Sequence, residues 1–154
     1  MRVHWTVVLA GLLGLLALLP ARQAASAPTG DLAAALQRTR ALQDAARVLR
    51  NGATAGADAD VLAAEAARLR ADLEALVTSH QQWAASLPDA HRAAVAPHFA
   101  DVESGCARMR GSLDDLDRTL QQAPIDRETV QSVGQSIGRQ ARLCGRALRR
   151  AQRG

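Results

Sequence analysis

Cys106 and Cys144 are the only two cysteines in the 154-residue chain, and their spacing suggests a covalent cross-link. They are equally far from Ile125, which lies in a predicted turn between two helices. Residues equidistant from such a turn lie at the same height in an antiparallel helical hairpin. Gly105 and Gly145 sit beside them and remove side chains where a disulfide needs close approach. In an oxidising compartment we expect a structural disulfide here, and the alternative is a pair of buried free thiols.

Three histidines, at positions 80, 91 and 98, gather near the predicted second hairpin. His80 and His98 fall at one height on facing helices, and Asp101 follows His98 by one turn. Two imidazoles and one carboxylate form a ligand set that suits a divalent metal ion. The sequence therefore predicts a candidate metal site at His80, His98 and Asp101, and it indicates no other cofactor. The alternative is that His80 is a helix-interface residue and that the other histidines are solvated.

A stripe of arginines follows one face of the last predicted helix. From Arg127 to the end there are seven arginines and one acidic residue, whereas residues 28–126 hold ten arginines and fourteen acids. Cations suit the C-terminal end of a helix, so the stripe has a plain structural explanation. Its functional interpretation is a surface for an anionic partner, either a membrane or an acidic protein. Its members recur at alternating spacings of three and four residues: Arg139, Arg142, Arg146, Arg149 and Arg153.

The sequence carries no recognised catalytic pattern. It has no nucleophile elbow, no glycine-rich phosphate loop and no His-Glu-x-x-His helix. We therefore expect a protein that is not an enzyme. Nucleic acid is disfavoured as a partner, because almost no aromatic side chains are available to stack on bases.

The first 27 residues are typical of a signal peptide. A short basic start precedes an apolar run over 7–19, Pro20 ends the run, and small residues follow. Cleavage is predicted after Ser26 or Ala27, which places residues 28–154 in the periplasm or outside the cell. The alternative is an uncleaved membrane anchor, although the apolar stretch is shorter than the roughly 20 residues that a span requires.

The remaining residues predict an all-α domain, an antiparallel up-down-up-down four-helix bundle. Alanine, leucine, arginine and glutamine dominate, and apolar residues recur at helical spacing. The first helix is expected to begin at Thr29 or Asp31 and to end near Asn51-Gly52. The third begins at a capping box over 86–89 and the fourth near Asp126. The second and third helices are expected to be longer and to project beyond the others.

Placing the predicted hairpins in register gives two core layers with one side chain from each helix. From these features we expect an exported, non-enzymatic bundle that binds a protein or an anionic surface. The contact would be the projecting hairpin tip or the arginine face. Alternatives are a metal or small-ligand carrier and a membrane-anchored accessory protein, and the oligomeric state is open. The two layers are Leu42, Leu69, Met109 and Ala141, followed by Thr39, Leu73, Cys106 and Cys144.

Overall fold

A computed structural model describes residues 27–154, and this part of the chain is all-helical. Four helices account for nearly all of it, and the described residues contain no β-strand. The predicted four-helix, all-α fold is therefore confirmed. The helices are α1 (Ala27–Ala55), α2 (Ala59–Ser86), α3 (Asp89–Leu120) and α4 (Arg127–Ala151).

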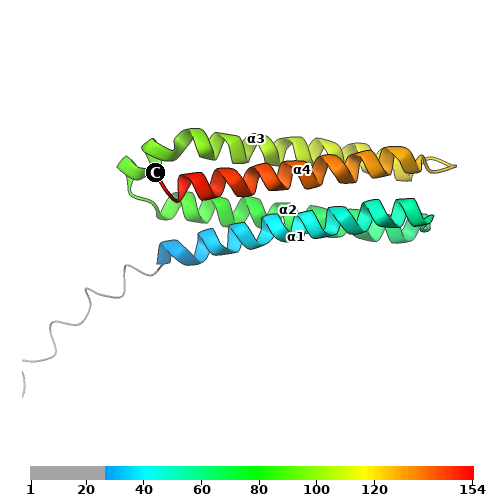
Figure 1. Ribbon diagram of the computed structural model, residues 1–154, viewed down its shortest axis with the longest axis horizontal. Helices are drawn as coiled ribbons and strands as arrows, with labels where there is room; N and C mark the ends of the chain where they lie inside the picture. Colours follow the sequence, from blue (N-terminus) through cyan, green and yellow to red (C-terminus); the bar gives the residue numbers. More distant parts are fainter. Residues whose placement is uncertain (1–26) are drawn as a thin grey trace, which may run out of the picture.

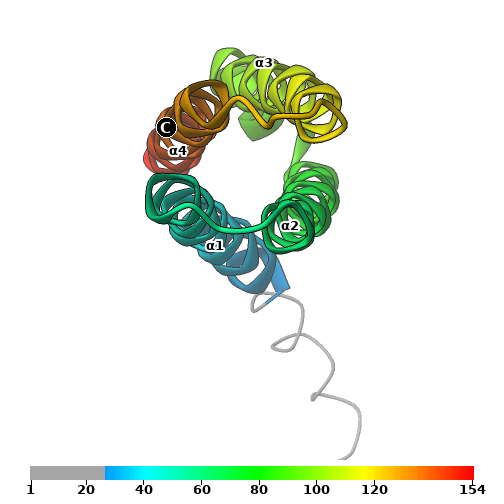
Figure 2. The same cartoon turned by 90° about the vertical axis from the view of Figure 1, so that its right-hand side faces the viewer.

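The helices pack side by side around one core (Figure 1). Contacts run in a cycle in which α1 touches α2 and α4, and α3 touches α2 and α4. Seen end-on, Figure 2 shows this cycle around a common centre. The connection between α1 and α2 lies at one end of the bundle, and the connection between α2 and α3 lies at the other. The arrangement places α1 beside α4, although these two helices are farthest apart in the sequence.

Both predicted core layers are buried. Leu42, Leu69, Met109 and Ala141 are fully shielded from solvent, and Leu73 and the two cysteines are also buried. Thr39 is a polar member of this core, and its hydroxyl donates a hydrogen bond of 2.8 Å to the carbonyl of Leu36. This bond within α1 satisfies the buried hydroxyl, so the layer tolerates a threonine.

The end of α1 differs from the prediction. The helix continues past Gly52 and ends at Ala55, and Gly56 follows with a φ of +79°. The amides of Gly56 and Ala57 donate to the carbonyls of Ala53 and Gly52 at 3.3 and 2.9 Å. This pair of bonds is the Schellman motif, which needs a left-handed residue after the helix. Gly56 therefore ends the helix, because its φ is positive and that of Gly52 is not.

The predicted N-terminal cap of α4 is confirmed, whereas the capping box predicted for α3 is not. Asp126 caps α4 as expected, because its carboxylate accepts hydrogen bonds from the amides of Glu128 and Thr129, both at 3.1 Å. These bonds, with one from the Thr129 hydroxyl, hold the Asp126 pKa below its usual value. The capping box over 86–89 is not formed. Ser86 is the last residue of α2, and its hydroxyl donates to the carbonyl of Trp83.

The helix lengths also correct the expectation that the second and third helices are the longer pair. α3 is the longest with 32 residues and continues through Pro97, but α2 has 28 residues against 29 in α1. The connection between α2 and α3 extends beyond the end of α4 in Figure 1. Its large apolar side chains are covered, since Trp83 and Val95 are 3% and 1% exposed. This tip therefore does not present an apolar contact surface built on Trp83 or Val95.

The predicted signal peptide lies outside the described residues, except that α1 begins with Ala27. Within the described part of the chain, no helix has the length and apolar character needed to cross a membrane.

Candidate functional site: an arginine groove between α1 and α4

Charge is divided between the two sides of the bundle. Helices α1 and α4 together hold ten arginines and three acidic residues, a net charge of +7. Helices α2 and α3 hold six arginines and ten acidic residues, a net charge of −4. Because α1 packs against α4 and α2 against α3, the bundle has one basic side and one acidic side.

The arginines of the acidic side are largely paired with carboxylates. Arg70 of α2 bridges to Asp114 and Asp117 of α3. In the other direction, Arg110 of α3 holds Glu74 of α2 through two hydrogen bonds of 3.0 and 3.1 Å. This forked contact lowers the pKa of the Glu74 carboxyl. Acidic and basic side chains thus neutralise one another between α2 and α3.

Most arginines of the basic side lack such compensation. Between residues 31 and 154, no α4 arginine takes part in a salt bridge. On α1, Arg38 pairs with Asp72 and Arg47 with Asp44, whereas Arg40 and Arg50 have no carboxylate partner within that same range. The positive charge of this side is therefore available to an external anion.

These side chains line a groove between α1 and α4, which we call the arginine groove. Two adjoining hollows make it, and they share Gln43 and Arg142. One hollow, of about 240 Å³, includes Asp44, Arg47 and Arg50; the other, of about 550 Å³, is bounded by Thr39 and Gly145. Six arginines line the groove: Arg40, Arg47, Arg50, Arg142, Arg146 and Arg149.

Glycines of α4 allow the two helices to approach here. A Cβ at Gly134 would lie 3.1 Å from the carbonyl oxygen of Ala46, and one at Gly145 would lie 3.0 Å from the Thr39 hydroxyl. Both distances are tighter than ordinary Cβ contacts. Gly145 was predicted to make room for the cysteines, but the structure places it against α1. Its missing side chain therefore shapes the groove.

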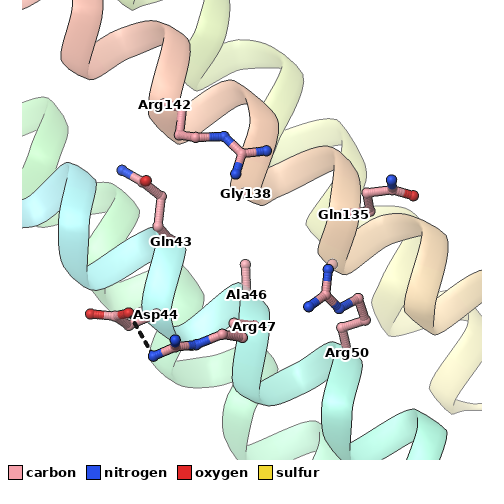
Figure 3. A pocket seen from close by; sticks show the side chains of 9 residues that line it. Gln43, Asp44, Ala46, Arg47, Arg50, Gln135, Gly138 and Arg142 are labelled. Carbon is pink, nitrogen blue, oxygen red and sulfur yellow. Dashed lines mark hydrogen bonds and ion pairs between the residues drawn. The ribbon is translucent and has the colours of Figure 1, made fainter.

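Figure 3 shows how the side chains of the smaller hollow lie. Arg142 extends from α4 over Gly138, and Arg50 rises from α1 toward α4. Arg47 is turned back along α1, where it forms its 3.0 Å ion pair with Asp44. Two guanidinium groups therefore enter the space between the helices from opposite walls.

Only part of the predicted arginine stripe lines the groove. Arg142, Arg146 and Arg149 line the groove, whereas Arg139 and Arg153 line neither of its hollows. Sequence reasoning missed the three arginines that α1 contributes. A signal was present, because Arg40 and Arg47 are seven residues apart, as are Arg142 and Arg149. This spacing puts each pair on one face of its helix.

The predicted disulfide is not present in the structure. Cys106 and Cys144 are free, buried thiols that are not at disulfide distance. They lie close enough for each thiol to shift the pKa of the other, and Cys144 Sγ donates a hydrogen bond of 3.7 Å to the carbonyl of Val102. The Cys144 sulfur occupies the space where a Cβ on Gly105 would be. The pair behaves as small core residues.

The neighbouring thiol and burial shift the pKa values of the two cysteines in opposite directions. The pKa of Cys144 is raised by the adjacent Cys106 thiol and by desolvation, which disfavours the charged form. The pKa of Cys106 is lowered by the adjacent Cys144 thiol, with a further contribution from the Arg110 charge. Both sulfur atoms remain shielded from solvent, so neither thiol is placed to attack a substrate.

The structure does not assemble the predicted metal site. His80 is buried against Phe99, with ring centroids 5.0 Å apart in an edge-to-face arrangement. Asp101 is exposed and lines a different hollow, between α3 and α4, with Arg108 and Arg146. In the described region, no cluster of three or more histidine, cysteine or acidic side chains could hold an ion.

His80 instead carries an unpaired polar atom inside the core. Its Nε2 is buried without a hydrogen-bond partner, and its ring and that of Trp83 both pack edge-on with Phe99. Desolvation lowers the His80 pKa, and the Glu103 carboxylate acts in the opposite direction. The imidazole is therefore a neutral core residue at pH 7.

The chain matches no known family, no curated protein and no solved structure. Among the cysteine pair, the histidines and the arginine groove, only the groove brings unpaired charged side chains together on one surface.

Proposed function

We propose that this protein is an exported, non-enzymatic, up-down-up-down four-helix bundle that binds an acidic partner protein in the arginine groove. The observation that carries the proposal is the set of unpaired guanidinium groups on facing walls of α1 and α4. Guanidinium groups bind carboxylates through two parallel hydrogen bonds, so each one is a specific anchor for an aspartate or glutamate.

The groove suits a polypeptide better than a flat anionic membrane. It is a lengthwise hollow between two helices, and Arg40 and Arg50 lie about 15 Å apart along α1 at the helical rise. Membrane-surface binding usually combines basic residues with a cluster of inserted apolar side chains. Within residues 31–154, the large exposed apolar residues, Val48, Val61 and Leu143, are spread over three different helices. An acidic segment lying along the groove uses the charges without such insertion.

Binding to a short poly-L-glutamate peptide tests the groove. Arg50→Glu with Arg146→Glu should weaken binding by about tenfold or more at a fixed ionic strength, since two attractions become repulsions. The matched control is Arg92→Glu with Arg118→Glu, which makes the same charge change on α3. Each control arginine already has an acidic partner one turn away. Equal weakening by both pairs, or none by the groove pair, would reject the groove as the binding surface.

Export is tested separately by intact mass spectrometry of protein recovered from the producing cells. The mass should correspond to residues 27–154 or 28–154, because the predicted cleavage follows Ser26 or Ala27. A mass that includes the apolar segment would show that the signal is retained, and the protein would then be a membrane-anchored one.

A further inference from the structure

The larger hollow of the arginine groove differs from the smaller one in its charge. Four arginines line it: Arg40 from α1, and Arg142, Arg146 and Arg149 from α4. No acidic residue lines it, whereas Asp44 lines the smaller hollow and pairs with Arg47. Its volume of about 550 Å³ lies within the range of small-molecule sites, about 300–1,000 Å³. The smaller hollow, about 240 Å³, lies below that range.

The polar residues between the four arginines already form hydrogen bonds within α1. Thr39 donates its hydroxyl proton to the carbonyl of Leu36, and Gln43 Nε2 donates to the carbonyl of Thr39 at 2.9 Å. Gly145 contributes no side chain, and its Cβ position lies 3.7 Å from Nη1 of Arg149. The guanidinium groups therefore supply most of the free hydrogen-bond donors of this hollow.

The number of arginine charges in the hollow, and the two helices from which they approach, indicate the class of ligand. Four guanidinium groups carry +4, whereas one phosphate monoester carries about −1.5 to −2 at pH 7. At least two phosphoryl groups are thus needed to balance the hollow. Arginines also approach from two helices, which suits a tetrahedral oxyanion with acceptors in several directions better than one planar carboxylate.

We propose that this hollow is a binding site for a ligand that carries two or more phosphoryl groups. The ligand is either a soluble polyphosphate or the headgroup of a phospholipid that carries two or more phosphoryl groups, and the two share this chemistry. A nucleotide base would find no ring to stack on, because the two aromatic residues within 27–154, Trp83 and Phe99, are both buried. The inference goes beyond the proposed function, because it assigns a second ligand class to one end of the same groove.

Calorimetric titration of the purified residues 27–154 with sodium tripolyphosphate, at constant ionic strength, tests the site. Arg40→Ala with Arg149→Ala should weaken binding by about tenfold or more, since each removes a charge-assisted contact. The matched control is Arg139→Ala with Arg153→Ala. It removes the same charge from the same basic side, but neither residue lines the hollow. We expect less than about a threefold loss there. Arg149→Lys should fall between wild type and the double variant, because lysine keeps the charge and loses the fork.

A second titration uses vesicles that contain phosphatidylinositol 4,5-bisphosphate, with phosphatidylcholine vesicles as reference, and distinguishes the two sources. Tripolyphosphate binding that is lost in the Arg40/Arg149 variant supports a soluble ligand. Binding to the phosphatidylinositol 4,5-bisphosphate vesicles alone, lost in the same variant, supports a lipid headgroup. Binding of neither probe, or equal weakening by the two double variants, overturns the site.

The two proposals fail separately. Arg47→Glu with Arg50→Glu changes only the smaller hollow. It should weaken poly-L-glutamate binding and leave tripolyphosphate binding within about threefold of wild type. If poly-L-glutamate does not bind but tripolyphosphate does, the acidic-protein proposal fails and the phosphoryl site stands.

Discussion

Gly105 provides the sharpest test of the packing around the cysteine pair. A Cβ added there would come closer than 3.0 Å to Sγ of Cys144, a contact that real Cβ atoms essentially never make. Cys144 is 1% exposed, so its sulfur has no solvent-facing position to move into. We therefore predict that Gly105→Ala forces α3 and α4 apart locally and destabilises the bundle.

The same helix supplies a matched control. Gly111 also lies within α3, and a Cβ there meets nothing within 4 Å. Replacing a helical glycine by alanine stabilises by about 1 kcal/mol when space is available, because alanine has the higher helix propensity. Overpacking a core costs about 1–3 kcal/mol. Gly111→Ala should thus gain about 1 kcal/mol, and Gly105→Ala should be about 1–3 kcal/mol less stable than that control.

Urea unfolding followed by circular dichroism at 222 nm measures this difference under reducing conditions. With an m-value of about 2 kcal/mol/M, a 2 kcal/mol difference separates the two midpoints by about 1 M urea. Cys144→Ala removes the opposing sulfur, so in the double variant much of the Gly105→Ala penalty should disappear. That recovery is a coupling energy of about 1–3 kcal/mol in a double-mutant cycle. If Gly105→Ala stabilises as much as Gly111→Ala, or if Cys144→Ala restores nothing, the proposed contact is wrong.

Two further predictions concern the other packed positions. The His80 pKa is lower in the folded state than its usual 6.5, so between those two values the unfolded state binds more protons and the stability of the fold decreases as the pH falls. Urea unfolding at pH 7.5 and pH 5 should show this loss of stability, and His80→Leu should reduce it. An equal loss in the His80→Leu variant would exclude His80 as its source. Gly134→Ala should be about 1–3 kcal/mol less stable than Gly138→Ala, because a Cβ at Gly134 would meet the backbone oxygen of Ala46 at 3.1 Å, whereas one at Gly138 makes an ordinary 3.7 Å contact with Ala46 Cβ. Equal thermal midpoints for the two variants would contradict the close approach of α1 and α4.

The helices themselves could be predicted because their signals are local. The spacing of apolar residues identified core positions such as Leu42 and Met109, and the Asp126 cap identified the start of α4. The end of α1 was placed at Gly52 instead of Gly56, since both glycines can follow a helix and only the backbone conformation distinguishes them. The capping box predicted at Ser86 does not form, because the Ser86 hydroxyl donates instead to the carbonyl of Trp83 in its own helix.

By itself, the sequence determined that the chain forms an all-α fold of four helices, that Cys106 and Cys144 face one another, and that one face of α4 is basic. Tertiary structure alone decided what each helical face meets. It placed Gly145 against Thr39, separated His80 from Asp101, and brought Arg40 and Arg50 of α1 to the arginines of α4. The physical reason is that helical periodicity specifies which residues share a face, whereas a groove depends on which two faces pack together and how closely their backbones approach.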